Sequence, residues 1–264
     1  MYRTGRIFWP LVLIAVGVLF LVDQLSNGAF HAGSFIGRWW PLLLVGLGLA
    51  ILLEAAWPAK AAADVPVAVD LGGAQGGDVR IDFGAGRLEI GPAAPGRLVD
   101  GTLGGGGRVE TAGPGRVRLR ADASDWWVGR WPGTRGFRRR VGLTLEVPIS
   151  LRVDTGASEN LLDLSALRVV DLELHTGASE TRIVLPQAAG SSTVRIEAGA
   201  AVVRLRVPPG VAARISGGMA MGAAHVDERR FPRSGAGWAS PDWASAANRV
   251  DVAFQGGMGG ITVE

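Results

Sequence analysis

Residues 151–164 read LRVDTGASENLLDL, and residues 172–185 read LELHTGASETRIVL. The pentapeptide Thr-Gly-Ala-Ser-Glu therefore occurs at 155–159 and again 21 residues later, at 176–180. Such an offset is typical of a stacked repeat in which each copy buries its apolar face against the next. Apolar residues alternate with polar ones around both copies, which indicates β-strands. We therefore expect TGAS to form a turn between two short strands, with glycine allowing a positive φ.

The alternation and the glycine-containing turns extend from residue 78 to the last residue. Short glycine-containing elements recur at 84–86, 156–158, 177–179, 199–201, 217–219 and 256–258. With 40 glycines, 14 prolines and no cysteine in 264 residues, the composition suits a turn-rich all-β fold without disulfides. The repeated turn predicts a β-solenoid-like domain over residues 78–264. A β-sandwich of short strands is the alternative.

Two apolar segments, at about 7–24 and 39–57, precede this domain and contain almost no charged residues. Each is long enough to cross a bilayer as a helix, which takes ~20 residues. We therefore expect a membrane-anchored all-β protein with a two-helix transmembrane hairpin over 1–57 and a linker over 58–77. Tryptophan rings favour the headgroup layer. The candidate membrane-interface residues are Trp9, Trp39, Trp40 and Trp57.

Basic residues beside these segments predict the orientation of the hairpin. Arg3 and Arg6 precede the first helix and Lys60 follows the second, whereas the link between them carries Arg38 together with Asp23. Cytoplasmic flanks of membrane helices carry an excess of lysine and arginine. We therefore expect a cell-membrane protein with two spans and with both termini, and the β domain, in the cytoplasm.

The sequence VDTGAS at 153–158 resembles the active-site signature of retroviral-type aspartic peptidases, which makes Asp154 a remote catalytic candidate. These enzymes need two carboxylates that share one proton. The second copy of the motif has His175 in that place, so only a homodimer could supply two copies of Asp154. No Walker-type or Gly-x-Ser-x-Gly motif is present, and the three histidines are far apart in a chain without cysteine. We therefore expect no enzyme, no cofactor and no bound metal.

Residues 121–140 interrupt the alternation and combine tryptophans with arginines. Both residue types are enriched at binding hot spots, and arginines near a membrane also attract anionic lipid. The candidate partner or lipid contacts are Trp126, Trp127, Trp131, Arg138, Arg139 and Arg140. The alternative is a loop whose tryptophans cover one end of the solenoid and whose arginines are solvated.

Two parts of the chain carry a family resemblance. The paired Trp-Pro segments within residues 6–57 resemble the membrane region of LiaI-like and LiaF-like envelope-stress proteins of bacteria. Residues 227–264, with a Trp-Ala-Ser loop and a Gly-Gly-Met-Gly-Gly turn before a final strand, resemble the C-terminal domain of LiaF-like proteins and the adhesin-like toast-rack domains. The resemblance implies a membrane-bound regulator that restrains the sensor kinase of a two-component system. Segment 121–140 has no counterpart in it.

We therefore expect a non-enzymatic regulator that binds a membrane protein such as a histidine kinase and biases it toward its inactive form. An envelope scaffold or adhesin-like protein with an external β domain is the alternative, and an aspartic peptidase is a remote one. Membrane lipid is a further expected partner, and the sequence is compatible with a homo-oligomer. A formal net charge of only +3 argues against a nucleic-acid partner.

Overall fold

The computed structural model describes residues 64–104, 107–121 and 138–264, and these residues form thirteen β-strands. Within these three ranges no helix is long and apolar enough to span a membrane. The expected membrane helices at about 7–24 and 39–57, and most of segment 121–140, lie outside the described residues.

The strands in chain order are β1 (Val65–Asp70), β2 (Gly77–Pro92), β3 (Arg97–Leu103), β4 (Arg108–Thr111), β5 (Arg116–Arg120), β6 (Arg138–Leu143), β7 (Ile149–Asp163), β8 (Val169–Val184), β9 (Ser191–Arg206), β10 (Ala212–Val226), β11 (Arg233–Ser234), β12 (Gly237–Ala239) and β13 (Arg249–Val263). The first strand lies within residues 58–77, where the sequence predicted a linker. It pairs antiparallel with β3, and its alternating valines pack against the core, so the β domain begins before residue 78.

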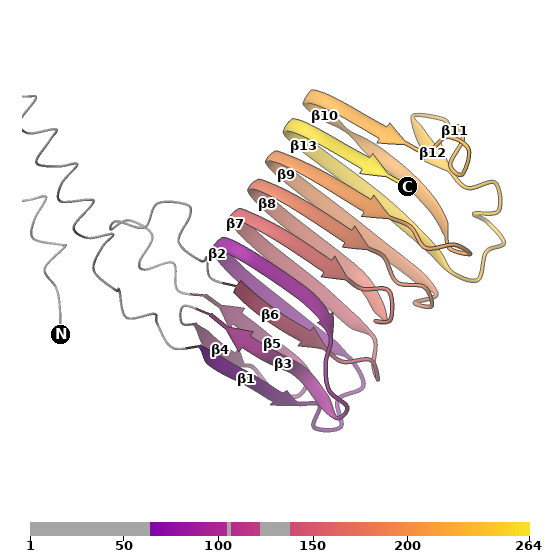
Figure 1. Cartoon of the computed structure of the whole chain (residues 1–264). Coiled ribbons are helices and arrows are strands. Elements are labelled where there is room, and N and C mark those ends of the chain that lie inside the picture. Colours follow the sequence, from indigo (N-terminus) through magenta and orange to yellow (C-terminus); the bar gives the residue numbers. More distant parts are fainter. Residues whose placement is uncertain (1–63, 105–106, 122–137) are drawn as a thin grey trace, which may run out of the picture. The chain divides into compact units, whose positions relative to one another are not determined.

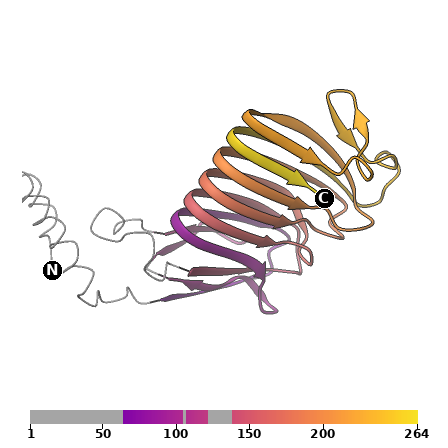
Figure 2. The same cartoon turned by 45° about the horizontal axis from the view of Figure 1, so that its top comes forward.

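Six long strands form the body of the domain in the spatial order β2, β7, β8, β9, β13, β10, and every neighbouring pair is parallel. Each of these strands bends back on itself, so that two arms face each other across the stack (Figure 1). The turned view shows the bent strands following one another like the rungs of a rack (Figure 2). The predicted β-solenoid-like architecture is confirmed, and the sandwich alternative does not apply.

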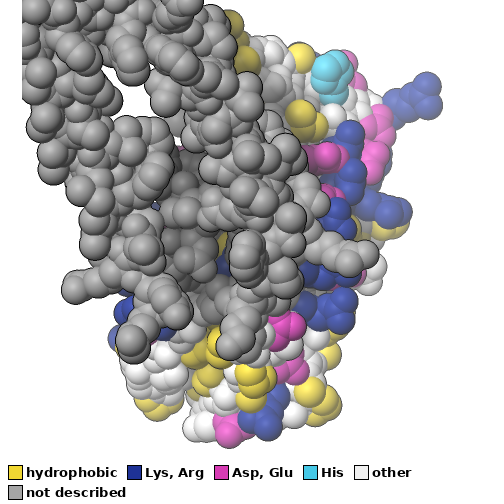
Figure 3. All heavy atoms as spheres, turned by 60° about the vertical axis from the view of Figure 1, so that its left-hand side comes forward, with side chains coloured by type: hydrophobic (Ala, Val, Ile, Leu, Met, Phe, Trp, Pro, Cys, Tyr) yellow, Lys and Arg dark blue, Asp and Glu magenta, His cyan; other side chains and the backbone are white. Residues whose placement is uncertain are grey.

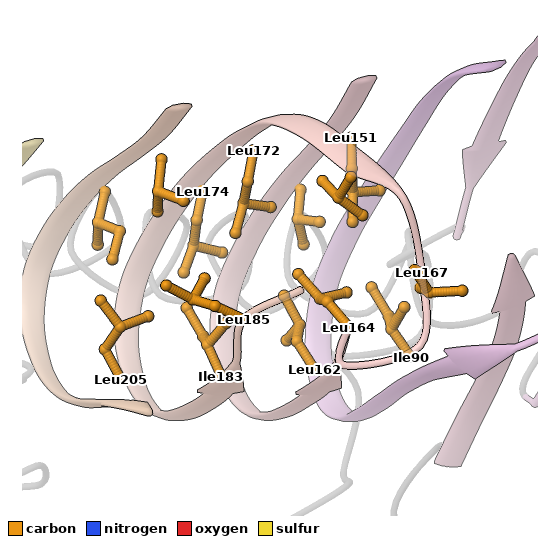
Figure 4. Close-up of a cluster of buried hydrophobic side chains, with 14 of the residues drawn as sticks. Ile90, Leu151, Leu162, Leu164, Leu167, Leu172, Leu174, Ile183, Leu185 and Leu205 are labelled. Carbon is orange, nitrogen blue, oxygen red and sulfur yellow. The ribbon is translucent and has the colours of Figure 1, made fainter. Parts of the chain in front are cut away.

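The hydrophobic core fills the space between the two arms. Leu151, Leu172 and Leu174 on the first arms face Leu162 and Ile183 on the second arms (Figure 4), and each of these side chains is at most 2% exposed. Burying one leucine or isoleucine side chain stabilises a fold by about 1.5–3 kcal/mol. One rung has too few such residues for a core of its own, so the rungs are stable only when stacked.

The Thr-Gly-Ala-Ser segments are bends inside continuous strands, so the predicted turn between two short strands is wrong. The central residues align across the stack in the column Ala85, Ala157, Ala178, Ala200, Met258 and Met221. Strand pairing continues through the bend because each rung finds a parallel neighbour on both sides of it.

Close approach between rungs, and not positive φ, explains the glycines at the bends of the three central rungs, Gly156, Gly177 and Gly199. A Cβ on Gly156 would lie 2.4 Å from the carbonyl oxygen of Gly84 in the preceding rung. The corresponding distances are 3.0 Å for Gly177 to Gly156 and 3.1 Å for Gly199 to Gly177. None of these three bend glycines has a positive φ. A side chain at the bend would therefore push neighbouring rungs apart.

The bend also changes which residues face the core. Along β7 the buried positions are Ile149, Leu151, Val153 and Thr155 before the bend, and Asn160 and Leu162 after it. The alternation thus shifts from odd to even residue numbers across the bend. Both arms of one strand can then point apolar side chains toward the same interior, which an unbent strand cannot do.

A small polar cluster is buried at the bend of the two central rungs. Thr155 Oγ1 donates to Thr176 Oγ1 at 2.9 Å, and Asn160 Nδ2 donates to Thr181 Oγ1 at 2.9 Å. The next rungs carry Leu88 opposite Asn160 and Val203 opposite Thr181. Buried polar groups are costly without a hydrogen-bond partner. The cluster therefore favours the register in which β7 and β8 are neighbours.

The strand order departs from chain order at one end of the stack. The last strand, β13, is inserted between β9 and β10, which are consecutive in the sequence, and pairs parallel with both. Beyond β10, strand β12 pairs with Arg214 and Ile215 of its first arm. At the other end β1, β3 and β6 continue the sheet next to β2, and β5 and β4 pair beside it.

We expect Gly156→Ala to lower the free energy of unfolding by about 1–3 kcal/mol, because the new methyl group overpacks the contact with the carbonyl of Gly84. Gly91→Ala in β2 is the matched control, since a Cβ there meets no atom within 4 Å. Urea unfolding of the detergent-solubilised chain measures both. Equal stability of the two variants would show that the bend does not require glycine.

Candidate functional site

The outer faces of the rungs carry ladders of alternating charge. Ion pairs join neighbouring rungs between Arg87 and Glu159, Arg152 and Glu173, Arg195 and Asp171, Arg204 and Glu180, and Arg214 and Asp251. Arginine and acidic side chains lie next to one another on the surface visible in Figure 3. Exposed pairs of this kind contribute at most about 1 kcal/mol each. The ladders therefore determine the charge pattern of the surface but contribute little to the stability of the fold.

The densest part of these ladders surrounds Asp154 on β7. His175 Nδ1 lies 2.7 Å from Asp154 Oδ1, and Arg152 Nε donates to Asp154 Oδ2 at 3.1 Å. The same Nδ1 atom lies 3.1 Å from Arg152 Nη2, which can only donate, whereas the carboxylate can only accept, so the ring tautomer decides which of the two contacts is a hydrogen bond. The second ring nitrogen, Nε2, lies 3.4 Å from Glu173 and 3.6 Å from Glu197.

Two opposing effects act on the pKa of Asp154. Partial burial raises it, but the hydrogen bonds from His175 and Arg152 together outweigh this effect and hold the pKa of Asp154 below its usual range. The side chain is therefore a carboxylate with cationic or hydrogen-bonding neighbours. This arrangement differs from two carboxylates that share a proton, so one copy of the chain does not build a peptidase dyad here.

A groove of about 760 Å³ crosses the rungs at this point. One wall follows a single register column, in which Asp154, His175, Glu197 and Gln255 come from β7, β8, β9 and β13 in turn. The remaining lining residues are small or polar, namely Thr155, Thr176, Gly177, Ala198, Gly199, Gly256 and Gly257. Five of the lining residues are glycine or alanine, and their small side chains leave room for the groove.

The groove has the chemistry of a docking site for cationic side chains. Three carboxylates, Asp154, Glu173 and Glu197, lie around it or next to it, and the guanidinium of Arg152 contacts the first two. Within the described residues no group of three metal-ligating side chains is arranged to hold a metal ion. Charge complementarity of this kind improves the rate and the specificity of association more than affinity.

The described part of the tryptophan- and arginine-containing segment is strand β6. Arg138 and Arg140 are 62% and 72% exposed in their side chains and lie 3.6 Å and 3.4 Å from Glu89. Arg139 points inward and is 4% exposed, with its guanidinium 4.5 Å from the ring centre of Phe83. Burial lowers the pKa of Arg139 to about 10. Only the outer two arginines are therefore accessible to a partner or to lipid.

The other predicted contact residues lie outside the described residues, namely Trp9, Trp39, Trp40, Trp57, Trp126, Trp127 and Trp131. Sequence reasoning singled out Asp154 and His175 but did not identify Glu197 and Gln255 as their neighbours. The repeat spacing could have identified Glu197, because it follows His175 by 22 residues, which is close to the repeat length of 21 residues. No such signal existed for Gln255, because β13 enters the stack out of chain order.

We expect Asp154→Asn to lower stability at neutral pH by less than about 1 kcal/mol, because the lost ion pairs are partly exposed. A depressed carboxyl pKa contributes stability above its ordinary value of 3.8, and that contribution is lost as the pH falls through the folded-state pKa. The difference from the unsubstituted chain should therefore shrink below pH 4. Urea unfolding at several pH values tests this, with exposed Asp78→Asn as the control. A difference that stays constant with pH would contradict the expectation.

Comparison with known families gives two adjacent matches. Residues 59–206 match the N-terminal domain of toast_rack (DUF2154), and residues 8–65 match the LiaF transmembrane domain. A comparison with curated proteins found no match.

Comparison with solved structures supports the architecture. The fold is similar to the crystal structure of a proposed cell adhesion protein from Clostridium sporogenes, with a TM-score of 0.67 at 17% identity, over 76% of this chain and 98% of that chain. A proposed adhesin from Bacteroides fragilis matches at 10% identity over 78% of this chain and 99% of that chain, but its TM-score of 0.24 carries no argument.

The toast-rack match spans more than half of the chain, and the LiaF transmembrane match directly precedes and overlaps it. The order of the two matches is the order that the sequence resemblance implied. The chain therefore belongs to the toast_rack family, and it is a LiaF-like membrane protein, of the kind that regulates the bacterial cell-envelope stress response.

Proposed function

We propose that this chain restrains a sensor histidine kinase of the envelope-stress response by binding it in the membrane. The observation that carries the proposal is the union, in one chain, of a LiaF transmembrane domain and a toast-rack domain. The transmembrane domain would pack on the membrane segments of the kinase, with two spans and both termini in the cytoplasm. The β domain would bind its cytoplasmic part.

The described β domain suits such a role because it can present surface groups to a partner at fixed positions. Its rungs are held by a continuous apolar core and by parallel pairing along their whole length, so its surface groups keep fixed spacings. The groove beside Asp154, His175 and Glu197 offers carboxylates to a cationic segment of the kinase. A partner that binds the inactive form of the kinase better than the active form shifts its population by that difference in affinity.

Co-purification of tagged full-length chain from its native membranes, after mild cross-linking, tests the proposal. We expect mass spectrometry to identify a histidine kinase among the captured proteins. The double variant Asp154→Asn/Glu197→Gln should capture severalfold less kinase, because it removes carboxylates from the groove. Asp78→Asn/Asp242→Asn removes two exposed carboxylates elsewhere and should capture as much as the unsubstituted chain.

The outcomes distinguish binding of a kinase from the use of the groove as the contact. Capture of no kinase by the unsubstituted chain would refute kinase restraint. Equal capture by both double variants would leave kinase binding in place and would move the contact away from the groove.

The fold likeness to a proposed adhesion protein favours one other function, an envelope scaffold with its β domain outside the cell. At 17% identity this likeness concerns the fold alone. Protease treatment of intact spheroplasts distinguishes the two functions. Cleavage of the β domain before lysis would support the external scaffold, and cleavage only after lysis would support the cytoplasmic regulator.

A further inference from the structure

One edge of the parallel stack lacks a strand partner along most of its length. Strand β10 is the last long rung (Figure 1), and β13 pairs with it on the inner side from Ala212 to Val226. On the outer side β12 pairs only with Arg214 and Ile215. No other described strand pairs with residues 216–226, so their outward backbone groups are free to pair with a further strand.

This stretch lacks the features that usually protect a sheet edge. Residues 216–226 read SGGMAMGAAHV, which contains no proline and no Asp, Glu, Lys or Arg. Natural edge strands are commonly protected by charge or proline, or by being very short. The edges at the opposite end of the stack follow that rule. β1 is short and contains Pro66, and the four residues of β4 include Arg108 and Glu110.

The exposed apolar surface of the domain also gathers at this edge. Met221 is 67% exposed, and its neighbour in the next rung, Met258, is 56% exposed. Of the four large apolar side chains that are exposed in the described residues, these two are the most exposed. An open backbone edge beside exposed methionines has the chemistry of a strand-pairing interface.

We propose that residues 216–226 pair antiparallel with the same residues of a second copy of this chain, about a two-fold axis at Met221. Ser216 then faces Val226 of the second copy, and Met221 faces its own counterpart. Charge favours a second copy as the occupant. An edge without charged side chains can meet itself without like-charge repulsion.

The length of the open stretch fits this pairing. The paired part of β12 ends opposite Ile215, one residue before the stretch begins, and the stretch ends where β10 itself ends, at Val226. Its central residue is Met221, which lies in the bend of β10, so the two-fold axis places the first arm of one copy over the second arm of the other. Anchoring in a membrane raises the effective concentration of the two copies.

Disulfide trapping tests this in the full-length chain, which has no cysteine of its own. Met221→Cys is oxidised in native membranes and examined on a non-reducing gel. We expect a reducible dimer in at least about tenfold greater yield than from Met258→Cys, because bridging requires Cα atoms within ~7 Å. Met258 is one rung farther from the axis in each copy and so cannot meet that limit.

A second variant shows whether the edge itself drives the contact. Adding Ala223→Glu, at an exposed position, should reduce the Met221→Cys dimer severalfold, because the new carboxylate would face Met219 of the second copy and would lose contact with water on pairing. Equal dimer yields from Met221→Cys and Met258→Cys would overturn the proposal, because they would indicate random collision. Absence of the dimer would also overturn it. If the Met221→Cys variant then also resisted labelling by maleimide, a different protein would be covering this edge.

Discussion

At the bends of the central rungs, a backbone carbonyl of the preceding rung occupies the space where a side chain would begin. The absence of a side chain at Gly156 and Gly177 allows the rungs to keep, through the bend, the spacing that strand hydrogen bonds set. Strand pairing through the bend and the alignment of leucines between the arms both depend on that spacing. The outer ion pairs join side chains that this stacking brings together, and they add little energy of their own. The dominant stabilising term is the apolar burial that close stacking permits.

The alternation and the repeated pentapeptide were sufficient to predict the solenoid-like class. They were insufficient to predict that each repeat is one bent strand, because a glycine needed for close approach looks the same in a sequence as one needed for a turn. The distinguishing signal was the change of phase, from Leu151 and Val153 to Leu162 and Leu164. A turn between separate strands imposes no such rule, whereas a bend within one strand must shift the alternation for both arms to face one core.

The site was predictable only where it follows the repeat. Asp154 and His175 occupy equivalent places in the two copies of the motif, so their proximity follows from stacking. The motif around Asp154 had suggested a peptidase. In the structure Asp154 instead contacts His175 and Arg152, as part of a ladder of charged side chains on the outer face. Gln255 reaches the groove by an insertion that no local pattern encodes. The inward position of Arg139, between two exposed arginines, follows from strand alternation only once β6 is recognised as a strand.

The insertion of β13 between β9 and β10 has a consequence for assembly of the domain. Strands β9 and β10 are joined by a short connection, yet they must leave a space of one rung between them, which β13 fills. Contacts of β13 with β9 close a loop of more than forty residues, which slows folding relative to rung-by-rung growth. Until that step, β9 and β10 both present open parallel edges. The last strand of the sequence thus holds an interior place in the rack, and without it two facing edges would be open to strands of other chains.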